Sequence, residues 1–89
     1  MSNISVYFGR VVKRLREKAR YSQEVLADKA NLNRTYLGEV ERGVAIPSLA
    51  TINKIATALN LSTSQLIALS ESHQQLSTAE KEARALTVE

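Results

Sequence analysis

The chain has 89 residues, no cysteine and a formal net charge of +3. A chain of this length forms one domain with a modest core, which leaves no room for a separate catalytic or ligand-sensing domain. The lack of cysteine excludes a disulfide framework and a thiolate metal site. Because there is no long apolar run and no basic-then-apolar leader, we expect a soluble protein of the cytoplasm.

Positive charge is concentrated in the first half of the chain. Residues 1–44 contain nine Lys or Arg and five Asp or Glu, a balance of +4, whereas residues 45–89 contain three and four, a balance of −1. A basic half favours a polyanionic partner such as duplex DNA, because each neutralised phosphate releases counterions. Taken alone, the net charge is explained more simply by a basic face that only contacts water. The choice between such a face and a DNA-binding surface therefore depends on the sequence motifs.

The first predicted helix follows a short arm at residues 1–5 and ends near Ala19. Its apolar residues recur at helical spacing, as expected for one face packed on a core: Phe8, Val11, Val12, Leu15 and Ala19. Gly9 weakens this helix and predicts close packing of another backbone, with a close pass to a phosphate as the alternative. After a short connection, Ser22 is placed to cap the next helix, which opens with Gln23.

Residues 23–42 predict two short helices hinged at Asn31. Asn tolerates the left-handed conformation that ends a helix, and Asn33 is suited to cap the second helix. Each helix has its own apolar stripe at spacings of three and four. The outer face of the second helix carries four residues that need a partner outside the motif: Arg34, Thr35, Tyr36 and Glu39.

Two more helices are predicted downstream. Gly43 is the natural C-cap of the preceding helix, and residues 48–59 have the apolar spacing of the next one. Ser62 with Gln65 forms a capping box that opens a last core helix through Leu69.

The predicted unit is therefore an all-α domain of five helices over residues 1–70, followed by a polar tail at 71–89. The pattern Ser77-Thr78-Ala79-Glu80 can cap one further helix to about Leu86, although its apolar stripe is thin. We expect this tail to be either a dimerisation extension or a disordered appendage.

Several spaced motifs resemble, in order, the lambda-repressor-like helix-turn-helix family of the Cro/C1 (XRE) type: Ser22-Gln23-Glu24, Leu26-Ala27, Glu41-Arg42-Gly43, Pro47-Ser48-Leu49 and Ile55-Ala56-x-Ala58-Leu59. The resemblance covers residues 5–69. Within the family, the run from Asn33 to Leu37 followed by Glu41-Arg42-Gly43 is similar to the controller proteins of restriction-modification systems.

The resemblance implies a DNA-binding domain with the helix-turn-helix at its second and third helices and the third helix in the major groove, as in phage repressors of this family. It implies that Arg34, Thr35, Tyr36 and Glu39 read base edges. Arg can bind guanine O6 and N7, Thr can present its methyl to thymine, and Glu can accept from cytosine N4. Tyr36 can instead pack on the first helix of the motif.

Five residues in or next to the motif are expected to contact phosphates: Ser22, Gln23, Asn33, Arg42 and Arg20. The loop at residues 43–46 is the alternative to Arg42. A hydroxyl and an amide at a helix N-terminus suit an anion. Weaker candidates lie in the first helix: Arg10, Lys13 and Arg14. The family also implies a partly buried ion pair between Arg16 and Glu41, which would turn Glu41 away from DNA.

The chain departs from the family pattern at three positions, where the family often has Gly, Gly and Ser: Arg20, Asn31 and Gly38. Asn31 is a chemically reasonable replacement, whereas Arg20 makes the end of the first helix less certain. Gly38 lies inside the recognition helix and predicts either tight packing or close approach to DNA.

A homodimer is expected, because one recognition helix covers few base pairs and two symmetric half-sites double the information. The expected surface is the last core helix with its preceding loop: Leu61, Leu66, Ile67 and Leu69. The alternative for Leu66 and Ile67 is that they belong to the core.

No catalytic, cofactor or metal site is predicted. His73, the single histidine, lies in the polar tail without carboxylates at ligand spacing, and no nucleophile has a base nearby. The expected partners are a double-stranded DNA operator and a second copy of the chain, with no membrane and no small-molecule ligand. The alternative is an antitoxin-like or adaptor protein whose main partner is another protein, a task that the polar tail would suit.

Overall fold

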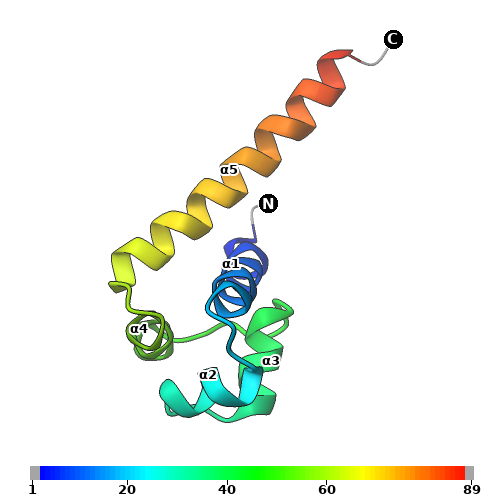
Figure 1. The fold of residues 1–89 in the computed structure, drawn as a ribbon. Helices are drawn as coiled ribbons and strands as arrows, with labels where there is room; N and C mark the ends of the chain where they lie inside the picture. Colours follow the sequence, from blue (N-terminus) through cyan, green and yellow to red (C-terminus); the bar gives the residue numbers. More distant parts are fainter. Residues whose placement is uncertain (1–2, 88–89) are drawn as a thin grey trace.

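Residues 3–87, the part that the computed structural model describes, form five α-helices and contain no strand. The helices are α1 (Ile4–Lys18), α2 (Gln23–Lys29), α3 (Arg34–Glu41), α4 (Leu49–Ala58) and α5 (Thr63–Thr87). α1 lies at the centre, with α3 packed on one side and α5 lying across the other (Figure 1). This confirms the all-α fold with the helix-turn-helix at α2 and α3.

Helices α2 to α5 each begin after a residue whose side chain caps them, whereas Asn3 before α1 makes no such hydrogen bond. Ser22, Asn33 and Ser48 each accept a hydrogen bond from the backbone N–H three residues later. Ser62 and Gln65 cap α5 reciprocally, because each side chain accepts from the other residue's N–H. These bonds satisfy donors that have no partner within the first turn of a helix.

Left-handed backbone ends the first four helices. The residues with positive φ are Arg20 (64°), Asn31 (54°), Gly43 (76°) and Asn60 (61°). The hinge at Asn31 is thus confirmed, whereas the C-cap of α3 is Arg42 and Gly43 is the left-handed residue that follows it. The glycine that the family often has at positions 20 and 31 adopts this conformation without steric penalty, and Asn adopts it more readily than Arg.

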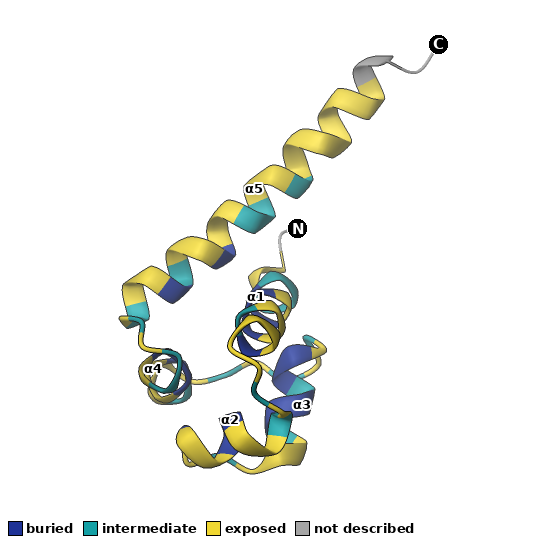
Figure 2. Cartoon of the chain, viewed as in Figure 1, coloured by how far each residue is buried: buried dark blue, intermediate teal, exposed yellow. Residues whose placement is uncertain are grey.

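The core is built from the inner faces of all five helices (Figure 2). Its buried members are Phe8, Val11, Val12, Leu26, Ala27, Ala30, Leu37, Val40, Ile52, Ile55, Ala56 and Leu66. Gly9 is buried where α1 crosses α3, and a Cβ there would meet the carbonyl oxygens of Val40 and Glu41, the latter at 2.6 Å. The packing explanation of Gly9 is therefore confirmed.

α5 runs unbroken from Thr63 to Thr87, so the prediction of a separate helix capped at Ser77 is wrong. Neither hydroxyl group at this point caps a new helix. The Thr78 hydroxyl donates to the carbonyl of Gln74 at 3.1 Å, and the Ser77 hydroxyl oxygen accepts from the Tyr7 hydroxyl of α1. Residues 78–85 are exposed, and the far half of the helix extends beyond the rest of the molecule (Figure 2).

The described helices include none that is both long enough and apolar enough to span a membrane.

Candidate nucleic-acid interface

The outer face of α3 carries the four residues that were expected to read bases. Arg34 and Thr35 are exposed, whereas Tyr36 and Glu39 are half-buried. Tyr36 also packs against the core, so its ring has a structural contact as well as an accessible portion. The opposite face of α3 is buried, and this packing fixes which side of the helix remains outside.

Both ends of α3 are held by hydrogen bonds that set its position. At its start, Asn33 Oδ1 accepts from the Tyr36 N–H at 3.2 Å. At its end, the Glu39 carbonyl accepts from the N–H groups of Val44 and Ala45 at 3.0 and 3.3 Å. The short helix is thus closed at each end by residues of the adjoining loops.

Arg16 and Glu41 form the expected ion pair. Arg16 Nε donates to Glu41 Oε2 at 2.7 Å and Arg16 Nη2 donates to Glu41 Oε1 at 3.1 Å. Both residues are buried, and Arg16 Nη1 also donates to the Tyr21 carbonyl at 2.9 Å. The hydrogen bond with Glu41 raises the pKa of Arg16 above its ordinary value, although burial acts in the opposite direction.

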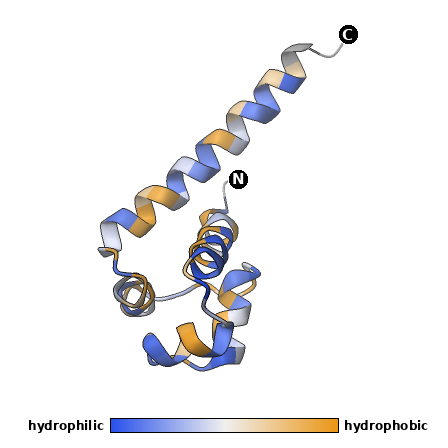
Figure 3. Cartoon of the chain, viewed as in Figure 1, coloured by the Kyte–Doolittle hydropathy of each residue, from blue (hydrophilic) through white to orange (hydrophobic). Residues whose placement is uncertain are grey.

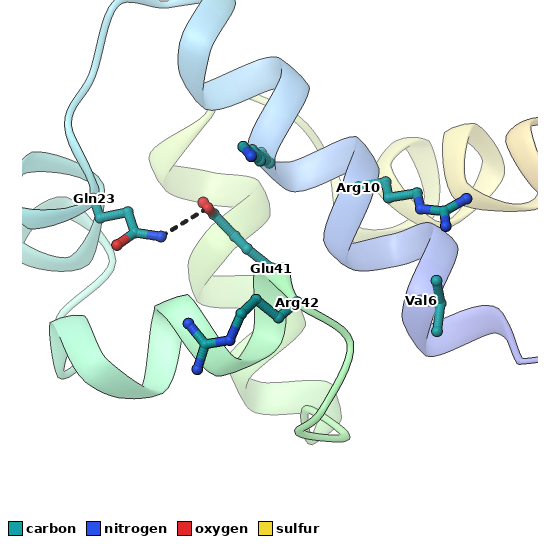
Figure 4. A pocket seen from close by; sticks show the side chains of 6 residues that line it. Val6, Arg10, Gln23, Glu41 and Arg42 are labelled. Atoms are coloured by element: carbon teal, nitrogen blue, oxygen red, sulfur yellow. Dashed lines mark hydrogen bonds between the residues drawn. The ribbon is translucent and has the colours of Figure 1, made fainter.

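Gln23 belongs to the same network, which the sequence did not reveal. Its Nε2 donates to Glu41 Oε1 at 3.0 Å, as Figure 4 shows. The three hydrogen bonds that Arg16 and Gln23 donate to Glu41 therefore tie α1 and the start of α2 to the end of α3. In the sequence, the only hint of this contact was the expectation that Glu41 turns inward. No local pattern links Gln23 to Glu41, because they are 18 residues apart.

Gln23 and Arg42 share a hollow of about 470 Å³ with two basic residues of α1. The hollow is lined by Val6, Arg10, Lys13, Gln23, Glu41 and Arg42 (Figure 4). Its carboxylate, Glu41, already has Arg16 as its partner. The hollow is therefore polar, concave and rich in positive charge, which suits an anion.

Gly38 lies beneath two side chains that border this hollow. A Cβ at position 38 would be 3.2 Å from Arg42 Nη1 and 3.7 Å from the side-chain amide of Gln23. The sequence offered tight packing or close approach to DNA as explanations of Gly38, and these contacts support tight packing. The side chains that pack on Gly38, Arg42 and Gln23, are themselves candidates for phosphate binding.

The remaining phosphate candidates do not line the hollow. Ser22 and Asn33 are exposed caps at the starts of α2 and α3. Arg20 is exposed in the left-handed turn before α2 and does not line the hollow. Arg14 lines a different groove, between α1 and α5.

The predicted dimer residues divide between core and surface. Leu66 is 0% exposed, so its assignment to a dimer surface is wrong: its side chain fills the core of its own chain. Leu61 and Ile67 are partly buried against that core, and Leu69 is 43% exposed. Leu69 is therefore the residue of this set that is most available to a partner.

No cluster of three His, Asp or Glu side chains among residues 3–87 is arranged to hold a metal ion.

Known proteins share this architecture. A family model described as helix-turn-helix matches residues 12–66. Control protein C.BamHI of Bacillus amyloliquefaciens is 40% identical over 67 residues, which are 74% of this chain and 83% of that protein. The immunity repressor protein of Bacillus phage phi105 is 39% identical over 59 residues, 66% of this chain, and the chain spans only 41% of its length.

Solved protein structures are also similar to the structure of this chain. The restriction-modification controller protein C.AhdI of Aeromonas hydrophila is 44% identical, with a TM-score of 0.68 over 70% of this chain and 94% of that one. The controller protein C.Esp1396I, solved as a tetramer with its natural 35 base-pair operator, is 25% identical. Its TM-score is 0.76 over 84% of this chain and 99% of that one.

Proposed function

The chain belongs to the helix-turn-helix family of the Cro/C1 type, and on this premise we propose that it is a sequence-specific transcription regulator. In this proposal it binds a two-fold symmetric operator in double-stranded DNA as a homodimer and places α3 in the major groove. The observation that carries the proposal is the exposed face of α3, with Arg34 and Thr35 outside and the opposite face fixed in the core.

Arg34, Thr35, Tyr36 and Glu39 are the proposed base readers. The Arg34 guanidinium can donate two hydrogen bonds to guanine O6 and N7, and the Thr35 methyl can contact a thymine methyl. Glu39 can accept from cytosine N4, while Tyr36 contributes the exposed part of its ring. The ion pair at Glu41 supports this role indirectly, because Arg16 balances the negative charge of the one carboxylate that lines the hollow.

The proposed phosphate contacts surround α3. Gln23 Nε2 gives one hydrogen to Glu41 and keeps a second to donate. Asn33 uses its Oδ1 as a cap, which leaves its amino group to donate. Arg42, beside the hollow, and Arg20, in the turn before α2, add charge, and Ser22 adds a hydroxyl at the start of α2.

Arg10 and Lys13 join this set because they line the same hollow as Gln23 and Arg42. We propose that a phosphate beside the end of α3 lies against this hollow. Phosphate contacts of this kind position the protein on the duplex without selecting a sequence.

Homodimer formation is part of the proposal, and the operator-bound tetramer of the similar protein C.Esp1396I supports it. Two recognition helices in successive major grooves require half-sites spaced about one helical turn, or a multiple of it, apart. A footprint on the operator therefore should show two inverted half-sites at such a spacing.

The test is a binding titration on the DNA upstream of the chain's own gene and on random duplex of the same length, at several salt concentrations. We expect a preference for the upstream DNA, together with a decrease in affinity as salt rises. Arg34→Ala should cost roughly 1–3 kcal/mol on the operator and little on random DNA, whereas Gln23→Ala should weaken both alike.

Equal affinity for operator and random duplex would contradict the regulator proposal and favour the adaptor alternative. Equal losses for Arg34→Ala on both DNAs would contradict only its role as a base reader.

A further inference from the structure

Leu69 and Leu76 form an apolar face on α5 that the described part of the chain leaves open. Their side chains are 43% and 64% exposed. A shallow groove of about 200 Å³ lies beside them between α1 and α5, lined by Val11, Arg14, Leu15, Leu69, Ser72, His73 and Leu76. Figure 3 shows that apolar segments recur along α5 beyond the region where it packs on α1. Exposed apolar surface next to a groove indicates an interaction site.

The adjoining face of α5 is already occupied, which fixes the direction of the open face. The Tyr7 hydroxyl lies 3.3 Å from Ser77 Oγ, and the Tyr7 ring meets the edge of the His73 ring at 5.5 Å between centroids. These contacts fasten the middle of α5 to α1. Leu69 and Leu76 are therefore held outward beside the groove rather than free to turn into the core.

Charges of opposite sign lie beside the open face, one on α1 and one on α5. The positive charge is Arg14 of α1, an exposed residue that lines the groove. Glu80 is exposed one helical turn after Leu76 and lies on the same face of the helix. A second copy of this chain thus supplies both the apolar residue and the carboxylate that the groove would match.

We propose that α5 pairs with α5 of a second copy in antiparallel orientation, with Leu76 opposite Leu76 of the other copy. This inference rests on the proposed homodimer and specifies its contact surface. Two-fold symmetry requires that, if residue i contacts residue j, then j contacts i.

The spacing along α5 then determines the other contacts. Leu69 and Ala83 lie seven residues to either side of Leu76, so each faces the other across the pair. Ser72 and Glu80 lie four residues to either side and also face one another. The Glu80 carboxylate of one copy consequently lies at the groove rim of the other, where Arg14 is located.

The first experiment uses the absence of cysteine from the chain. Leu76→Cys in the full chain should give a covalent dimer under mild oxidation, because a disulfide requires Cα atoms within about 7 Å. The matched control is Glu82→Cys, which lies off this face and should stay monomeric on a non-reducing gel. Failure of Leu76→Cys to cross-link above this control would overturn the pairing.

Orientation is tested by mixing Leu69→Cys with Ala83→Cys. Antiparallel pairing predicts the mixed disulfide and little self-linking of either variant. Self-linking of Leu69→Cys in preference to the mixed product would show parallel pairing and overturn the proposed register.

A second experiment measures the dimer dissociation constant by sedimentation equilibrium without DNA. Arg14→Glu and Glu80→Arg should each weaken the dimer several-fold, and the double variant should recover most of the loss. Glu82→Arg, with the same change of charge as Glu80→Arg, should leave the constant near that of the unchanged protein. Equal effects of Glu80→Arg and Glu82→Arg would contradict the proposed contact.

These measurements are independent of DNA binding. A protein that prefers its operator but shows none of these effects retains the proposed function and pairs through another surface. A protein that cross-links as expected but binds all DNA equally retains the pairing and loses the regulator proposal.

Discussion

Arg16 of α1 donates two hydrogen bonds to the carboxylate of Glu41 at the end of α3, and both residues are buried. α3 is only eight residues long, so its own hydrogen bonds contribute little to holding its orientation. The ion pair, together with the hydrogen bond from Gln23, fixes the end of this helix relative to α1 and α2. The geometry of the proposed DNA-reading face therefore depends on a buried contact between α1 and the end of α3.

Glu41→Gln should destabilise the fold by about 3–5 kcal/mol, because it leaves the buried Arg16 cation without a counter-charge. Urea unfolding measures this loss directly. Glu24→Gln, a change at an exposed position in the first turn of α2, is the matched control and should cost about 1 kcal/mol or less. The double variant Arg16→Met with Glu41→Leu should regain most of the lost stability. A loss for Glu41→Gln no larger than that of the control would contradict the role of the ion pair.

Gly9→Ala should destabilise the protein by about 1–3 kcal/mol or more, since the added Cβ would meet two carbonyl oxygens of α3 and force the helices apart. In an open helix the same change would be stabilising by about 1 kcal/mol. The sign of the change in unfolding free energy therefore distinguishes the two cases. A more stable Gly9→Ala variant would show that α1 and α3 do not approach as closely as described.

Gly38→Ala should separate stability from DNA affinity. Its Cβ would meet the far end of the flexible Arg42 side chain at 3.2 Å, which can move, so helix propensity should raise stability by up to about 1 kcal/mol. The displaced Arg42 should then bind phosphate less well. We expect a higher unfolding midpoint and weaker binding to operator and random DNA alike. Unchanged DNA affinity would show that the position of Arg42 is unimportant for binding.

Arg20→Gly should stabilise the fold by about 0.5–1 kcal/mol, because Arg20 has a φ of 64° and glycine relieves the left-handed strain, partly offset by its greater unfolded-state entropy. Thermal unfolding provides the measurement. Asn31→Gly is the comparison and should gain less, since Asn tolerates this conformation better.

The same Arg20→Gly variant tests a proposed phosphate contact. If Arg20 binds a phosphate, the slope of log affinity against log salt concentration should decrease by about 1. A more stable variant with an unchanged slope would leave Arg20 as a turn residue only.

Much of the candidate site could be predicted because its signals are local. Asn33 is recognisable as a cap from its position before α3, and Arg34 and Thr35 follow as exposed residues from the apolar spacing of that helix. The ion pair between Arg16 and Glu41 came from the family resemblance, and the structure contains it. The misplaced break at Ser77 has a local and a tertiary cause: the Thr78 hydroxyl bonds back to the Gln74 carbonyl within the helix, and the Ser77 hydroxyl oxygen accepts from Tyr7 of α1.

The sequence by itself determined the helices, their caps, the turn at Asn31 and the outer face of α3, because each depends on residues within about one or two turns of one another. Only the tertiary structure decided that Leu66 is core, that Gln23 binds Glu41 and that Arg42 covers Gly38. Those outcomes depend on how helices far apart in sequence approach in space. Packing between helices sets that approach, and helical periodicity alone does not specify it.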